Sequence, residues 1–152
     1  MKVLFLSTVV VVALISGCAN APLSGVSSPE LSMLQPRQAI LLAAEAAPAS
    51  IPGTFVLSVK ATGTQNSYVY LNSEADYRDQ RCLSIALTPE AAQQLTTRLG
   101  ESPLIALKGR TILVQGAAIR TRINFFSNGL ATDKYYYQTH VNVTNADQIT
   151  VR

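Results

Sequence analysis

Short runs of alternating apolar and polar residues fill the last two thirds of the chain. β-Branched and aromatic residues dominate these runs, which is typical of strands. The runs lie at 55–61, 68–71, 81–87, 110–117, 119–126, 135–143 and 148–151. A polar, turn-rich segment at 62–67 separates the first two runs as a hairpin loop, and Gly116 permits a bend within the long fourth strand. We therefore expect a mainly β domain.

The period of the pattern changes once, directly after the third run. Thr88 offers a capping hydroxyl, Pro89 stands at the first helical position, and Glu90 places an acid in the first turn. Apolar residues then recur at helical spacing before Gly100, namely Ala91, Ala92, Leu95 and Leu99. The pattern predicts one helix, roughly from Pro89 to Leu99, between the third and fourth strands.

Three strands, a helix and a long bent hairpin follow one another in the order of the OB-fold. Two segments, 107–116 (LKGRTILVQG) and 146–151 (ADQITV), resemble the late strand and the closing segment of bacterial OB-like domains, although Arg110 stands where such strands commonly carry lysine. The resemblance implies a small OB-like antiparallel β-barrel over residues 54–152. The same alternation would also fit another small antiparallel barrel or a sandwich.

Residues 18–53 have a different composition, rich in Ala, Ser and Pro. Prolines interrupt every run there, at Pro22, Pro29, Pro36, Pro48 and Pro52. This composition predicts a tether ahead of the domain. One stretch within it, 37–47, consists of good helix formers behind Pro36, so a short helix could form there and dock on the domain.

The first 17 residues have the layout of a secretory signal. Lys2 supplies a positive charge, and the apolar run at 3–15 is too short to span a bilayer comfortably. The Ile-Ser-Gly-Cys sequence that ends at Cys18 resembles the lipobox of bacterial lipoproteins. The resemblance implies that Cys18 is the first mature residue and carries a diacylglycerol and a further acyl chain, which together anchor a protein firmly. In a Gram-negative cell, Ala19 in place of an aspartate implies the outer membrane. The alternative is an ordinary signal peptide in which Cys18 is incidental.

Charge and cysteine content narrow the class of partner. Lys and Arg number 12 and Asp and Glu number 9, and loss of Lys2 with the signal leaves a net charge of about +2, which is too weak to indicate nucleic acid. If Cys18 is lipidated, Cys82 has no partner within the chain and cannot close an internal disulfide. The alternation around Cys82 favours a small core residue over a reactive thiol or an intermolecular disulfide.

Residues 74–81 form the first chemically dense segment. Three acids, two arginines and a tyrosine lie between the second and third strands, and opposite charges at such spacing favour a self-paired surface loop. The functional alternative is a recognition loop in which Tyr77, Arg78 and Arg81 contact an anionic or sugar ligand, the arginines through planar bidentate contacts. The paired carboxylates specify neither an acid nor a nucleophile, so a glycosidase is not favoured.

The final hairpin is the second candidate. If Phe126 pairs with Lys134, five side chains share one face: Arg120, Arg122, Tyr136, Gln138 and His140. A tight turn at Asn128-Gly129 would instead shift the pairing by an odd number and set the two arginines beside Tyr137 and Tyr135. We expect the first register, because burying one face decides pairing more strongly than one dipeptide. Its cations, rings and amides would suit an oligosaccharide or a single strand, although a merely solvated β-face has the same composition.

The sequence offers no catalytic constellation beside these residues. His140 lies mid-strand without a nucleophile motif, and no metal-ligand spacing, phosphate loop or cofactor motif occurs. We therefore expect a non-catalytic, lipid-anchored binding or assembly module on the periplasmic face of the outer membrane, which contacts a glycan, an anionic ligand or an envelope protein. A structural or inhibitory partner of another envelope protein is the alternative. An envelope hydrolase is less favoured, because it would need Asp76 or Asp79 near His140. Nucleic acid is not expected, and the oligomeric state stays open.

Overall fold

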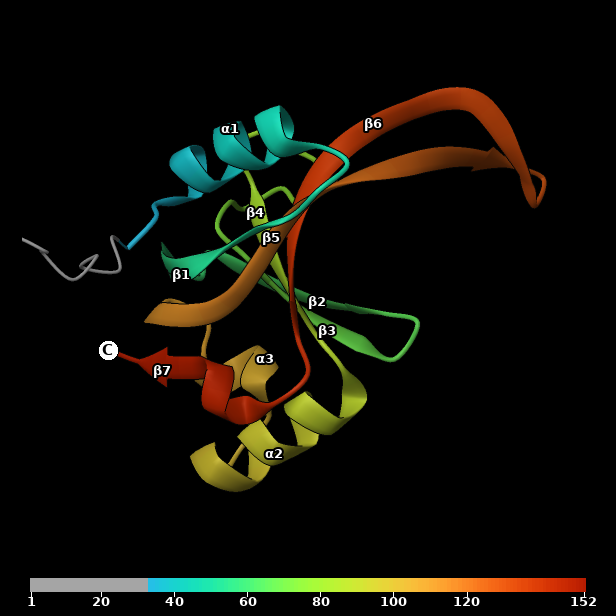
Figure 1. Cartoon of the computed structure of the whole chain (residues 1–152). Helices are drawn as coiled ribbons and strands as arrows, with labels where there is room; N and C mark the ends of the chain where they lie inside the picture. The colour runs from blue at the N-terminus through green and yellow to red at the C-terminus, as the bar shows by residue number, and fades with distance from the viewer. Residues whose placement is uncertain (1–32) are drawn as a thin grey trace, which may run out of the picture.

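The structure is a computed structural model and describes residues 33–152. The signal peptide expected at 1–17 and the lipidation expected at Cys18 lie outside the described residues and stay predictions, as does the location that they imply. Within residues 33–152, no helix is long and apolar enough to cross a membrane. The mainly β class is confirmed, because seven strands of this range form one sheet, which three α-helices accompany (Figure 1).

The described part of the chain has the following elements, in order: α1 (Pro36–Ala46), β1 (Ile51–Ser58), β2 (Ala61–Gln65), β3 (Tyr68–Asn72), β4 (Leu83–Leu87), α2 (Pro89–Leu99), α3 (Pro103–Ala106), β5 (Thr111–Ser127), β6 (Leu130–Val143), a 3₁₀ turn (Ala146–Gln148) and β7 (Ile149–Val151). The strand order is β1-β5-β6-β4-β3-β2, and β7 pairs with β5. The pairing of β4 with β6 is parallel and all other pairings are antiparallel. The sheet is open, so the closed barrel expected from the sequence is not confirmed.

The helix expected after the third strand is confirmed as α2. The hydroxyl of Thr88 accepts a hydrogen bond from the backbone N–H of Ala91 at 3.2 Å, and Gly100 ends the helix in the left-handed conformation with φ of 80°. Ala91 and Leu95 are fully buried. The same connection also contains the short helix α3, which the sequence pattern did not predict.

Part of the segment expected as a tether belongs to the fold. The short helix expected at 37–47 is confirmed as α1, whose Ala39 and Ala43 are fully buried in the core. Ahead of it, Leu34 exchanges backbone hydrogen bonds with β1, from Leu34 N to Thr54 O at 2.8 Å and from Val56 N to Leu34 O at 3.0 Å. The folded unit therefore begins well before residue 54. The proline-rich composition concealed this, because small alanines make the fully buried contacts of α1 and only Leu34 and Ile51 add larger apolar side chains.

The first hairpin is tighter than expected. Most of the predicted loop at 62–67 is strand β2, which pairs with β3 up to Gln65 opposite Tyr68. The turn consists of Asn66 and Ser67 alone, and both have positive φ, as two-residue hairpin turns require. The hairpin therefore extends to one side of the body, below the long ribbon of β5 and β6 (Figure 1).

One hydrophobic core lies between the inner face of the sheet and the helices. Alternate strand residues supply it, among them Phe55, Leu71, Ile85, Ile112 and Val141, all fully buried. The helix α1 lies at one end of the curved sheet, and α2 and α3 lie at the other (Figure 1). Cys82 is 2% exposed, which confirms the expected small core residue. Because side chains alternate along a strand, the residues between these apolar ones point to the outer face.

Candidate binding groove

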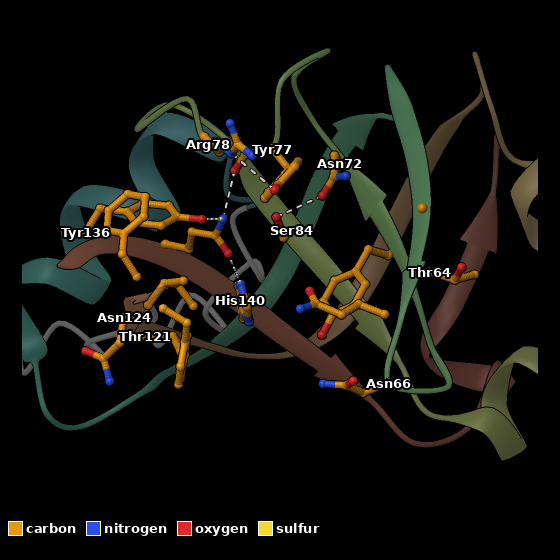
Figure 2. A pocket seen from close by; sticks show the side chains of 17 residues that line it. Thr64, Asn66, Asn72, Tyr77, Arg78, Ser84, Thr121, Asn124, Tyr136 and His140 are labelled. Atoms are coloured by element: carbon orange, nitrogen blue, oxygen red, sulfur yellow. Dashed lines mark hydrogen bonds between the residues drawn. The ribbon is translucent and has the colours of Figure 1, made fainter. Parts of the chain in front are cut away.

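An open groove of about 740 Å³ lies on the outer face of the sheet, within the size range of ligand sites. Its walls come from the β2–β3 hairpin, the loop between β3 and β4, and the ribbon of β5 and β6 (Figure 2). Most of the lining residues fall into three groups. The aromatic ones are Tyr70, Tyr77, Phe125, Phe126 and Tyr136, and the amides are Gln65, Asn66, Asn72, Asn124 and Gln138. The other polar side chains are Thr64, Ser84, Thr121, Arg78 and His140. None of the lining residues is a carboxylate, and one of them is a permanent cation.

Strand register aligns the floor of the groove. Asn72 lies opposite Ser84, and Ser84 lies opposite His140, so three neighbouring strands present one row of polar side chains. The hydroxyl of Ser84 donates a hydrogen bond to Oδ1 of Asn72 at 2.9 Å. Both residues are buried, and their bond satisfies groups that would otherwise cost free energy on burial. This end of the floor is therefore rigid and already paired.

Gln138 connects the floor to the walls. Its Nε2 donates to the backbone carbonyl of Tyr77 at 3.0 Å and to the hydroxyl of Tyr136 at 3.1 Å, and its Oε1 lies 2.7 Å from Nε2 of His140 (Figure 2). One side chain thus fixes the 74–81 loop, one aromatic wall and the imidazole at the same time.

The same contacts determine the state of His140. Because Oε1 of Gln138 can only accept, Nε2 of His140 carries the proton and donates it. Burial lowers the pKa of His140, so the ring is neutral near pH 7 and Nδ1 is its acceptor atom. The imidazole and the ring of Tyr70 are arranged edge to face, with their centroids 6.0 Å apart. Burial also raises the pKa of Tyr70 and of Tyr136, so both hydroxyls keep their protons.

The outer aromatic wall lies beside a β-bulge. The register of the β5–β6 ribbon shifts between Asn124 and Phe126, where residues 132–134 of β6 lie opposite Phe125 alone. Phe125 follows Thr121 and Ile123 onto the groove face by strand alternation, and its ring lies 5.3 Å from that of Tyr136. Both rings line the groove, although Phe125 is 46% exposed. They offer apolar faces to a ligand rather than filling a core.

The 74–81 loop closes one side of the groove and is largely self-paired, as expected. Arg81 makes a bidentate ion pair with Asp79 at 2.7 and 3.0 Å, and these bonds lower the pKa of Asp79 to about 2. Asp76 accepts from the backbone N–H of Arg78 at 2.9 Å. Arg78 stacks on the ring of Tyr77 at 5.2 Å and donates from Nε to its hydroxyl at 3.1 Å. Tyr77 and Arg78 therefore line the groove, whereas Arg81 does not.

The register expected for the final hairpin is wrong. The tight turn at Asn128-Gly129 does form, and Arg122 pairs with Tyr137 and Arg120 with Thr139. The two arginines therefore lie on the face opposite the groove, stacked over Tyr135 and Tyr137 at 4.0 and 3.8 Å. Most of this ribbon extends beyond the core, so core burial does not select its register there and the turn does.

Of the eight residues proposed from the sequence for ligand binding, the groove brings together five: Tyr77, Arg78, Tyr136, Gln138 and His140. Sequence reasoning missed the contribution of β3 and β4. The signal was the alternation of Tyr70 and Asn72 with the apolar Val69 and Leu71, which places a tyrosine and an amide on the face away from the core.

Residues 33–152 contain no group of three His, Cys, Asp or Glu side chains that could hold a metal ion. Comparisons of the chain with protein-family models, with curated proteins and with solved structures give no significant match.

Proposed function

We propose that this protein is a non-catalytic binding module of the bacterial cell envelope and that its groove binds an oligosaccharide. The observation that carries the proposal is the composition of the groove: rings, amides and hydroxyls line about 740 Å³, with a single arginine and no carboxylate. Such a lining matches a ligand that is neutral, polar and flat-faced.

The two kinds of lining group have separate roles. Tyr136 and Phe125 form one aromatic corner, and Tyr70 lies beside His140. Exposed ring faces can stack on the apolar C–H faces of sugar rings, while phenol hydroxyls remain able to hydrogen-bond. The amides and hydroxyls of the floor offer both donors and acceptors, which is what sugar hydroxyls require. The fixed position of Gln138 keeps these groups oriented before a ligand arrives.

The charge of the groove argues against a polyanion. Proteins that bind single-stranded nucleic acid combine stacking rings with a positively charged channel along the backbone. Here Arg78 is the only permanent cation among the lining residues, and Arg120 and Arg122 lie on the other face. Arg78 suits at most one acidic substituent of a glycan, at the rim.

The same geometry supports the proposal of binding without catalysis. Neither Asp76 nor Asp79 lines the groove: within the loop, Asp76 accepts from the backbone N–H of Arg78, and Asp79 pairs with the guanidinium of Arg81. The Nε2 proton of His140 is already donated to Gln138. A hydrolase would need an acid and a base or nucleophile directed at one bond, and the lining residues supply no such pair.

We further propose that the sheet is an OB-like barrel. The two ends of the strand order, β1 and β2, are consecutive in the chain, with only Val59 and Lys60 between them. Val59 donates to the carbonyl of Arg110, and Lys60 donates to that of Asn72, so the bend stays hydrogen-bonded to both sides. Read as one bent strand, they would complete the ring, and the OB-fold binds oligosaccharides on the equivalent face. A crystal structure in which β1 and β2 belong to two separate sheets would contradict this interpretation.

The location rests on the lipobox-like sequence at Cys18. We propose a lipid anchor there and a periplasmic orientation at the outer membrane, a compartment that contains glycans. Labelling with a fatty-acid probe that is lost in Cys18→Ser supports the anchor, and labelling that persists in Cys18→Ser refutes it.

A glycan array probed with the full chain tests the binding function. Two adjacent tyrosines provide a matched pair: Tyr136 lines the groove, and Tyr135 lies on the opposite face beneath Arg122. Tyr136→Ala should weaken binding by up to about tenfold, since an aromatic contact contributes about 0.5–1.5 kcal/mol. Tyr135→Ala should leave binding unchanged. Equal binding by both variants, or an array without any retained glycan, would refute the proposal.

A further inference from the structure

The β5–β6 ribbon projects from the body as a two-stranded finger (Figure 1). Pairing of β1 with β5 ends at Ala118, and pairing of β4 with β6 begins at Thr139. Within the described chain, residues 121–138 therefore pair only with one another, and no third strand lies beside them. Two-stranded ribbons are marginal by themselves in water. Stacking of Arg120 on Tyr137 and of Arg122 on Tyr135 stiffens this one.

The end of the ribbon is apolar and exposed. Phe126 is 67% exposed and Leu130 is 74% exposed, among the most exposed large apolar side chains of residues 33–152. They flank the turn at Asn128-Gly129. The two side chains lie outside the hydrophobic core, on opposite faces of the ribbon end, and present apolar area that an external surface can cover.

Cations and tyrosines follow the apolar end along the ribbon. Arg122 lies four residues and Arg120 six residues from Phe126, which corresponds to about 13 Å and about 20 Å along a strand. Both arginines, Tyr135 and Tyr137 are exposed, and Lys134 adds a third cation against the single acid Asp133. Behind the apolar end, cations and tyrosine rings are interleaved along the ribbon, beginning with Lys134 and Tyr135.

We propose that this finger docks on an anionic phospholipid surface. The order of its side chains matches the polarity gradient of a bilayer, in which tyrosine rings occupy the interface and cations meet the headgroups. A protein interface has a different layout, with an apolar centre surrounded by a polar rim. Phe126 and Leu130 enter the acyl boundary, and the stacked guanidinium groups pair with phosphates. The proposal does not depend on the anchor at Cys18, and it shares one residue, Phe126, with the groove.

Tryptophan fluorescence tests this docking in the full chain with Cys18→Ser, so that no acyl anchor binds the vesicles by itself. The sequence contains no tryptophan, so Leu130→Trp introduces a unique reporter at the apolar end. Ile105→Trp is the matched control, since Ile105 is 69% exposed on α3, on another side of the molecule (Figure 1). Vesicles of phosphatidylcholine with an equal part of phosphatidylglycerol should shift the Leu130→Trp emission to shorter wavelength and permit quenching by brominated acyl chains. The Ile105→Trp emission should not change, and phosphatidylcholine alone should have little effect.

The charge requirement is tested in the Leu130→Trp background. Arg120→Gln and Arg122→Gln should each weaken vesicle binding by about fivefold, the ratio expected for one cation near an anionic membrane. Arg110→Gln, which removes an equal charge away from the ribbon, should not. An unchanged Leu130→Trp emission, an equal response of Ile105→Trp, or an equal response to neutral vesicles would overturn the proposal. So would a shift that grows with protein concentration without vesicles, because a second copy would then cover the finger.

Discussion

Replacing Gln138 with methionine removes the three side-chain hydrogen bonds by which this residue joins the groove floor to its walls. The side chain makes three such bonds, to the Tyr77 carbonyl, the Tyr136 hydroxyl and the His140 ring. Each net contribution is about 0.5–1.5 kcal/mol, and partial exposure places these bonds at the lower end. We therefore expect Gln138→Met to lower the free energy of unfolding by about 2 kcal/mol, or the melting temperature by about 8 °C at roughly 4 °C per kcal/mol for a domain of this size.

Urea unfolding followed by circular dichroism measures this change. Gln65→Met is the matched control, because Gln65 also lines the groove but is exposed. Its effect should stay within about 0.5 kcal/mol, as for most surface substitutions. A Gln138→Met protein as stable as the control would refute the role assigned to Gln138 and, with it, the preformed groove.

Two further predictions concern the sheet and its pH response. Gly116→Ala brings a Cβ within 2.8 Å of Cγ1 of Val141, so we expect a loss of about 1–3 kcal/mol in urea unfolding, and an unchanged midpoint would contradict this close contact. Burial lowers the pKa of His140, so the neutral form is favoured in the folded state. This contribution to stability is complete above the pKa of the unfolded state, about 6.5, and is lost as the pH falls through the lowered pKa of the folded state. Melting temperatures measured over that descending range should fall more steeply for the wild type than for His140→Gln, and parallel curves would argue against a buried neutral imidazole.

Local signals in the sequence predicted the parts of the fold that depend on local physics. The cap at Thr88, the proline at Pro89 and the spacing of Leu95 determine α2 without help from distant residues. The helix formers behind Pro36 likewise predicted α1. Its burial was harder to predict, because whether Ala39 and Ala43 face solvent or the core depends on a sheet formed by residues further along the chain.

The candidate site was only partly predictable because it depends on register. A shift by one residue moves every side chain of a strand to the other face, and for the β5–β6 ribbon the turn at Asn128-Gly129 decided the shift. Arg120 and Arg122 therefore lie on the face opposite the groove, and not in the binding site for which the sequence proposed them. Alignment of Ser84 with His140 through a parallel pairing of β4 and β6 is a long-range contact that no local pattern encodes.

The groove as an oligosaccharide site is tested most directly by nuclear magnetic resonance titration of the full chain with the glycan that the array retains best. We predict shifts at Tyr70, Ser84 and Tyr136, together with the side-chain amide of Gln138 and the ring of His140. Signals from α2 and from Arg120 on the opposite face should not move. Shifts confined to the Arg120 face, or spread evenly over the domain, would contradict the account.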